Sequence, residues 1–241
     1  MAFKHGSKAR IYVGGTGLGD DISPYVRSVT NSSELDTASV DVMGGTYKQS
    51  VTGLLGASLS LQGYIDGAAG ASDAIFGPSG AFQSSTKENV IYMPQGNTGG
   101  EFGYGMNSWE TSYEMTTDVG DAGQWTANFQ SDVGLQRGML VHAYQAEGAG
   151  GTAPSVSTGW DYTAQSTLGG WAYLITNTAA SLAVTLSSST ATNGTYNTFA
   201  TFTTTSVKGS EYIPIATTTI ERFIRCVWTG TGTFAVLFGR K

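Results

Sequence analysis

Residues 57–65 alternate between apolar and polar side chains and read Ala57-Ser58-Leu59-Ser60-Leu61-Gln62-Gly63-Tyr64-Ile65. In an extended chain, Leu59, Leu61 and Gly63 point to one side, and the two serines and Gln62 point to the other. A period of two residues predicts a β-strand with one buried face and one polar face.

The rest of the first 150 residues consists of short strand-like stretches separated by glycine-rich turns. The predicted strands cover residues 10–13, 22–29, 39–43, 89–93, 108–115 and 124–129. One helical turn is expected at 71–78, because Ser72 can cap it and Gly77-Pro78 ends it.

The remaining residues have a simpler pattern, which predicts a compact antiparallel β-sandwich. Its six predicted strands cover residues 170–175, 182–186, 198–202, 211–215, 222–228 and 234–238, with turns such as 193–194 and 229–232. Between 146 and 158, small residues without periodicity indicate a flexible connector. We therefore predict an all-β chain with a β-sandwich domain at 1–147, a linker at 148–158 and a second β-sandwich domain at 159–241.

The composition excludes several classes of protein. Charged residues make up 12% of the chain, no apolar run approaches bilayer-spanning length, and residues 1–6 lack the apolar stretch of a signal peptide. The single cysteine, Cys226, excludes an intrachain disulfide, which fits synthesis in a reducing cytoplasm. Because Cys226 lies in an alternating run, we expect a buried structural thiol.

Charge is distributed unevenly along the chain. Residues 1–150 contain seven Lys/Arg against fifteen Asp/Glu, a net of −8, whereas residues 151–241 contain five against three, a net of +2. Together these give the net charge of −6. The acidic excess argues against binding of a phosphate backbone by the first part, and its simplest role is solubility.

Catalytic and metal-binding patterns are weak throughout. His5 and His142 are far apart and have no metal-ligand spacing, and no serine lies in a nucleophile-elbow context. The glycine-rich residues 14–19 lack the Lys-Ser/Thr ending and the following helix of a phosphate loop, so a hairpin turn is expected there. Asp20-Asp21 could bind a divalent cation, but adjacent acids in a turn are usually solvated. We therefore predict no enzyme activity, no cofactor and no metal.

Glu110 and Glu114 are the most suggestive pair of acids. Positions i and i+4 of a strand share a face, at a Cα separation of about 13 Å. This exceeds the spacing of a typical glycosidase acid pair, so a polar surface stripe is expected instead.

The stretch at 43–55 is longer than a hairpin turn, yet it carries apolar residues such as Tyr47, Val51, Leu54 and Leu55. An exposed loop with apolar residues often has a partner that buries them. The alternative, in which the loop folds back on its own core, is equally compatible with the sequence.

Five segments of residues 1–142 are informative as an ordered set. They are Ala2-Phe3-Lys4-His5-Gly6-Ser7 with the strand that follows, Asp21-Ile22-Ser23-Pro24-Tyr25-Val26, Glu34-Leu35-Asp36-Thr37-Ala38, the loop 43–55 and residues 57–66. In this order they resemble the major tail protein, or tail tube protein, of long-tailed bacteriophages. Residues 221–228 and 232–240 resemble the extra β-sandwich that some of these proteins carry.

The resemblance implies that the first domain joins its sheets between neighbours in a hexameric ring, forming a β-barrel around a channel, and that rings stack into a tube. The inter-ring loop would use Met43, Tyr47, Lys48, Val51, Leu54 and Leu55. Residues 2–7 would join these ring-to-ring contacts. Glu110 and Glu114 would line the channel and repel DNA, and the second domain would lie on the tube exterior.

The same resemblance implies a location and partners. The protein would belong to the virion tail, be made in the host bacterial cytoplasm, and serve as the conduit for DNA ejection without membrane insertion. Its partners would be copies of itself and terminator, tape measure, and baseplate or tip proteins, while DNA would pass without specific binding.

Two other function classes remain open at the level of sequence. A capsid-decoration or carbohydrate-binding module would also be β-rich and poor in cysteine, and would use exposed aromatics such as Trp160, Trp171, Tyr173 or Tyr196. A hydrolase is the third option, and it lacks a convergent catalytic set.

Overall fold

The computed structural model describes residues 6–15, 17–40, 49–66, 72–77, 86–154, 158–203 and 205–241. As predicted, the protein is all-β, and α1 is the one α-helix in these ranges. The helical segments are η1 Gly6–Lys8, η2 Ser23–Tyr25 and α1 Ser72–Phe76. The strands are β1 Arg10–Gly15, β2 Leu18–Asp21, β3 Val26–Val40, β4 Gln49–Tyr64, β5 Glu88–Met93, β6 Phe102–Thr116, β7 Gln124–Ser131, β8 Gln136–Glu147, β9 Gly151–Ala153, β10 Trp160–Asp161, β11 Gly170–Ser189, β12 Asn197–Thr201, β13 Gly209–Ile215 and β14 Phe223–Arg240.

One run of strands crosses the molecule in the order β12-β11-β14-β8-β6-β5-β1-β2. Its neighbours pair antiparallel, β9 and β10 add to β14, and β13 adds to β11. Strands β1 and β2 pair as a hairpin, with Gly14 opposite Gly19 and Gly15 opposite Leu18, which confirms the hairpin expected in this glycine-rich stretch.

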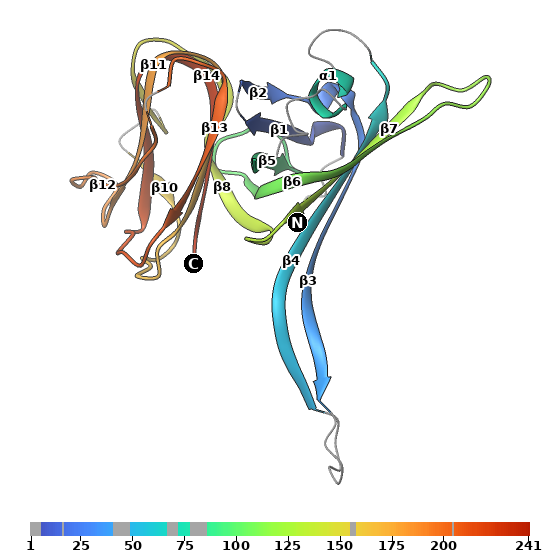
Figure 1. Cartoon of the computed structure of the whole chain (residues 1–241). Coiled ribbons are helices and arrows are strands. Elements are labelled where there is room, and N and C mark those ends of the chain that lie inside the picture. The colour runs from blue at the N-terminus through green and yellow to red at the C-terminus, as the bar shows by residue number, and fades with distance from the viewer. Residues whose placement is uncertain are drawn as a thin grey trace.

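Strand β6 belongs to two sheets. Its first half pairs with β5 and β8, whereas its second half, residues 109–116, pairs with β7. The resulting four-stranded sheet has the order β3-β4-β7-β6. In Figure 1 the β3–β4 hairpin extends far below the body, and the β6–β7 hairpin extends from its upper right.

The four-stranded sheet buries one face, as the alternation at 57–65 predicts. Leu59 and Leu61 are buried at 3% and 0% exposure, together with Phe129 of β7. Phe76 of α1 covers them, with its ring centroid 5.2 Å from that of Trp125 and 5.7 Å from that of Phe129. The short helix thus closes a core between the two sheets.

The C-terminal strands are longer than predicted. Residues 170–175 and 182–186 are parts of the single strand β11, and the turn predicted at 229–232 is wrong because these residues continue β14. Register shifts between Thr176 and Thr178, and between Ala180 and Ala183, accommodate the extra residues so that the ladder continues.

The buried core at the centre of the molecule combines residues from both predicted domains. Tyr12, Ile91, Met93 and Leu140 pack in one cluster with residues of β11 and β14. The latter are Trp171, Tyr173, Ile175, Ala235 and Leu237. The approach is so close that a Cβ at Gly105 would lie 2.4 Å from the Tyr173 ring.

The sheet continues across the predicted linker at 148–158. Strand β8, from the first part, lies between β14 and β6, and β9, inside the predicted linker, pairs with Cys226–Trp228. The division into domains at 1–147 and 159–241 stays a prediction, but the two parts share one hydrogen-bonded sheet.

Cys226 fulfils the structural role expected from its alternating run. It is completely buried in the C-terminal core cluster, and this burial raises the pKa of its thiol. A buried, protonated thiol is a poor nucleophile.

Candidate functional site

The outer face of the four-stranded sheet is a hydroxyl and amide surface. Its side chains alternate with the buried ones and come from β3, β4, β6 and β7: Thr30, Ser32, Glu34, Ser58, Ser60, Gln62, Ser112, Glu114, Thr126, Asn128 and Gln130. The Oγ atoms of Ser32 and Ser58 are 2.8 Å apart, and the Asn128 Nδ2 donates to Ser112 Oγ at 2.9 Å. A hollow of about 430 Å³ lies over this face.

This face carries few charges. Among its described side chains, the acids are Glu34 and Glu114, both exposed. Arg27 lies near its rim, with the guanidinium carbon 5.7 Å from the centroid of the Tyr64 ring. The described portion of the face is therefore polar and weakly acidic, and it lacks the cluster of cations that holds a phosphate backbone.

Glu110 and Glu114 lie on opposite faces of β6, so the predicted shared stripe is wrong. Glu110 pairs with Phe129 on the core side, whereas Glu114 pairs with Thr126 on the polar side. The register shift between Glu110 and Ser112 makes Thr111 an extra residue, and one extra residue reverses every following side chain.

The Glu110 carboxyl group is buried against the core. Within the described ranges neither of its oxygens has a hydrogen-bond partner, and burial raises its pKa to about 8. Nearby, the Tyr113 hydroxyl donates to Asp73 Oδ1 of α1 at 3.2 Å. Burial first, and Asp73 second, raise the pKa of Tyr113 to about 12.

Replacement of Glu110 by Gln should stabilise the protein at alkaline pH. Folding favours the protonated carboxyl, so this group costs stability as pH rises from its unfolded pKa toward about 8. Because water still screens part of the side chain, we expect a gain of about 1–2 kcal/mol at pH 9 and little change at pH 4. Urea unfolding of both proteins at the two pH values measures it.

The matched control is Glu114→Gln, because Glu114 is exposed. We expect it to change the free energy of unfolding by less than about 0.5 kcal/mol at either pH. An equal effect of the two substitutions would contradict the assignment of the buried carboxyl.

The predicted assembly loop overlaps the end of the β3–β4 hairpin. Met43, Tyr47 and Lys48 lie outside the described residues. Part of the stretch predicted as a loop is strand, because β4 begins at Gln49 and includes Val51, Leu54 and Leu55. Val51 is opposite Ala38, Leu55 is opposite Leu35, and Leu54 lies within a register shift.

Both edges of the four-stranded sheet lack a partner strand in the described parts of the chain. Strand β3 pairs only with β4 along its 15 residues, and residues 109–116 of β6 pair only with β7. Such an edge offers unpaired N–H and C=O groups to another chain. This surface was not visible in the sequence, because pairing partners are set by topology.

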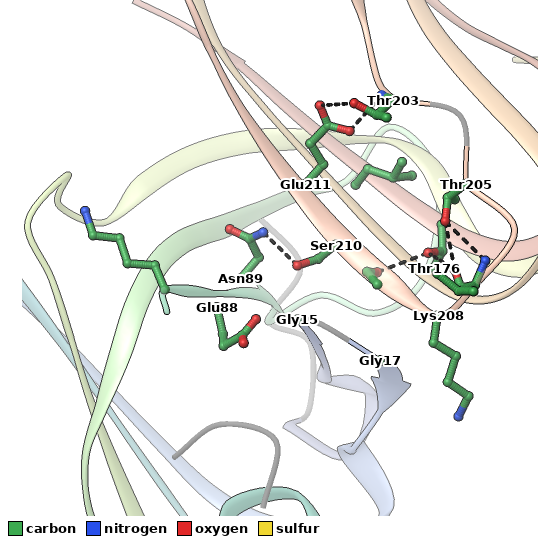
Figure 2. A pocket seen from close by; sticks show the side chains of 14 residues that line it. Gly15, Gly17, Glu88, Asn89, Thr176, Thr203, Thr205, Lys208, Ser210 and Glu211 are labelled. Atoms are coloured by element: carbon green, nitrogen blue, oxygen red, sulfur yellow. Dashed lines mark hydrogen bonds between the residues drawn. The ribbon is translucent and has the colours of Figure 1, made fainter. Parts of the chain in front are cut away.

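A polar pocket of about 310 Å³ lies where the β1–β2 turn meets β13 (Figure 2). The Asn89 side chain donates to Ser210 Oγ at 2.8 Å, and Glu211 accepts a hydrogen bond from the Thr203 backbone at 2.7 Å. Lys208 Nζ lies 3.1 Å from Asp20 Oδ1. The Asn89–Ser210 and Asp20–Lys208 contacts thus join residues before the predicted linker to residues after it.

The described part of the chain contains neither a cluster of metal ligands nor a membrane-spanning helix. No group of three His, Cys, Asp or Glu side chains there could hold a metal ion. Asp20, a candidate ligand, is instead paired with Lys208. Among the helices in the described ranges, none has the length and apolar character needed to cross a bilayer.

No protein-family model and no curated protein matches this chain. The tail of an empty gene transfer agent particle, refined with C6 symmetry, is 15% identical over 55% of this chain and 97% of its own, with a TM-score of 0.43. The SPP1 tail tube is 13% identical over 54% of this chain and 77% of its own, also with a TM-score of 0.43. The SPP1 Dit protein, a hub of the adsorption apparatus in phages infecting Gram-positive bacteria, is 10% identical over 95% of this chain and 97% of its own, with a TM-score of 0.37.

Proposed function

We propose that this chain is a structural protein of a phage-type tail, whose copies join their four-stranded sheets into a ring around a channel for DNA. The observation that carries the proposal is this sheet, with one face buried, the other polar, and both edges available for pairing. Six copies per ring is the number that the sequence resemblance implies.

Ring closure would satisfy the two edges. A long, regular edge strand is a liability in a monomer, and natural proteins normally cover or interrupt it. Pairing β3 of one copy with residues 109–116 of β6 in the next copy extends the sheet, and a closed ring of copies has no edge left. The buried faces would then point outward toward α1, and the polar faces would line the channel.

The polar face suits the passage of DNA. Hydroxyl and amide groups hold no net charge, and the exposed Glu34 and Glu114 repel phosphate. DNA would therefore move through without the counterion release that drives binding to Lys and Arg. Of the two predicted channel acids, we retain Glu114 and exclude Glu110, because the latter faces the core.

The β3–β4 hairpin is suited to contact an adjacent ring, because it projects well beyond the body (Figure 1). Of the predicted inter-ring residues, Val51, Leu54 and Leu55 belong to its strand β4. The C-terminal part would lie outside the channel wall. Terminator, tape measure, and baseplate or tip proteins would be the other partners of the protein in the tail. The particle would be assembled in the bacterial host and would deliver DNA through this channel.

The aromatic residues that a carbohydrate-binding module would expose are occupied within the fold. Trp171 and Tyr173 are buried at 5% and 0% exposure. Trp160 Nε1 donates to the Val141 carbonyl at 2.8 Å, and Arg225 lies 3.6 Å above the Tyr196 ring. These side chains do not form a flat sugar platform, which favours the assembly role.

The proposed function predicts rings from the purified protein alone. Negative-stain electron microscopy, with the mass measured by light scattering, should show six-fold rings or hollow tubes of uniform diameter. Isolated rings would indicate a hub-like ring, and tubes would indicate a tail tube. A protein that stays monomeric at all concentrations and binds glycans would instead favour the decoration or carbohydrate-binding function.

A further inference from the structure

The β6–β7 hairpin ends in an exposed acidic turn. Its residues Asp118-Val119-Gly120-Asp121 lie between β6 and β7, and the Asp121 amide donates to the Asp118 carbonyl at 3.2 Å. Val119 is fully exposed. No Lys or Arg occurs in the sequence between 88 and 136, and neither aspartate forms an ion pair within the described residues. We name this turn the acidic tip.

A groove of about 380 Å³, lined by residues of β6, β8 and the C-terminal part, carries the opposite charge. Its walls include Phe102, Arg137, Tyr162, Arg240 and Lys241, and we name it the basic groove. The Arg137 guanidinium lies 4.2 Å from the Phe102 ring centroid, and that of Arg240 lies 4.8 Å from the Tyr162 ring centroid. Arg240 also donates to the backbone carbonyls of Tyr162 and Ala164.

The Asp161 carboxylate attracts Arg240 at longer range, but no direct salt bridge holds the cations of the basic groove in the described residues. In the described ranges, Arg137, Arg240 and Lys241 form no ion pair with a carboxylate. The nearby acid Asp161 is held by Arg222, whose Nη2 lies 2.6 Å from its Oδ2. Three cations line one groove, so this groove would attract an anionic partner.

We infer that the acidic tip of one copy docks into the basic groove of a second copy. Asp118 and Asp121 would face Arg137 and Lys241, and Val119 would cover Phe102, which is 40% exposed. The contact joins opposite charges around an apolar centre, as protein interfaces commonly do.

The acidic tip cannot occupy the groove of its own chain. Figure 1 shows the β6–β7 hairpin at the upper right and the C-terminal end, which forms part of the groove, on the left at about mid-height. A contact between two different surfaces is heterologous, and its repetition builds a ring or a filament. The inference therefore rests on the proposed self-assembly and adds a contact outside the sheet edges.

Site-specific cross-linking tests this contact. Val119→Cys in one chain and Gln165→Cys in another place thiols on the acidic tip and at the basic groove, and the buried Cys226 stays unreactive. Mixing the two under mild oxidation should give an interchain disulfide, which forms only when the Cβ atoms approach to about 4 Å. The control pairs Val119→Cys with Val207→Cys, which is 67% exposed and lies outside the groove, and should not cross-link.

Charge reversal then tests the recognition. Asp118→Lys with Asp121→Lys in the tip chain should slow cross-linking by about tenfold or more. Adding Arg137→Glu with Lys241→Glu to the groove chain should restore it. Restoration by the swapped charges excludes misfolding as the cause of the loss.

The outcomes separate this inference from the proposed function. Rings in the microscope without the disulfide between the tip chain and the groove chain would overturn the docking contact and leave the ring intact. The disulfide without rings would support the contact and contradict ring closure through the sheet edges. Binding of dextran sulfate to the groove, with no cross-link between chains, would also overturn the inference.

Discussion

A proline on the free edge of β3 is expected to abolish ring formation while leaving the monomer folded. Consecutive N–H groups of a strand point to opposite sides of the strand. One of the two variants Thr30→Pro and Asn31→Pro therefore loses a hydrogen bond to β4, and the other loses an N–H donor at the open edge. The variant with the missing inner bond should lose about 1–3 kcal/mol of folding stability. The variant that lacks only the open-edge donor should have the same folding stability as the unmodified protein, yet remain monomeric.

The two proline variants control for each other, because they are neighbours on the same strand. Thermal unfolding identifies which proline faces the open edge, and electron microscopy with light scattering measures assembly. Thr30→Ala controls for the loss of the hydroxyl and should still assemble. If the stably folded proline variant forms normal rings, β3 is not the pairing edge and the ring proposal in its present form is wrong.

Leu237→Ala is expected to destabilise both halves of the molecule together by about 2–5 kcal/mol. Leu237 is completely buried, lies opposite Tyr173 in β11 and Leu140 in β8, and belongs to the core cluster that contains Tyr12 and Ile91. The substitution leaves a cavity in a core that both predicted domains share, so it destabilises both of them.

Hydrogen exchange measures this coupling. The amides of β4, remote from Leu237, should lose as much protection as those of β11, because the sheet and the shared core unfold as one unit. Leu168→Ala is the control, since Leu168 is 61% exposed, and it should cost less than about 0.5 kcal/mol. Unchanged protection of β4 in Leu237→Ala would instead indicate two independent domains.

The sequence was sufficient for the parts of the fold that depend on local alternation. Leu59 and Leu61 are buried and Ser58 is exposed, as their period of two predicts. The helical turn before Gly77-Pro78 is α1. These features follow from neighbours in the chain, so a single sequence carries the information.

The failures arise where one residue changes the register. Glu110 and Glu114 obey the spacing rule for a regular strand, but the extra residue Thr111 turns them to opposite faces. Likewise, residues 229–232 have turn composition, yet their partners in β11 hold them in strand β14. In both cases the strand conformation was determined by tertiary pairing, which the intrinsic propensities of the residues do not predict.

The basic groove and the sheet edges are beyond sequence reasoning for a different reason. Arg137 and Arg240 are remote in sequence and approach each other because β8 and β14 are neighbours in the sheet. An edge is defined by the strand that is missing beside it, which no motif encodes. Such surfaces emerge only when the strand order is known.

Because β6 passes unbroken from one sheet into the other, it couples the two sheets mechanically. In an assembled ring, tension on the edge at 109–116 would run along the covalent chain into the ladders with β5 and β8. Those hydrogen bonds would be loaded in shear, all at once, and the dense shared core would pass the load on to β14. A mechanical pull on the C-terminal part would thus be transmitted to the four-stranded sheet, which forms the channel wall in the proposed ring.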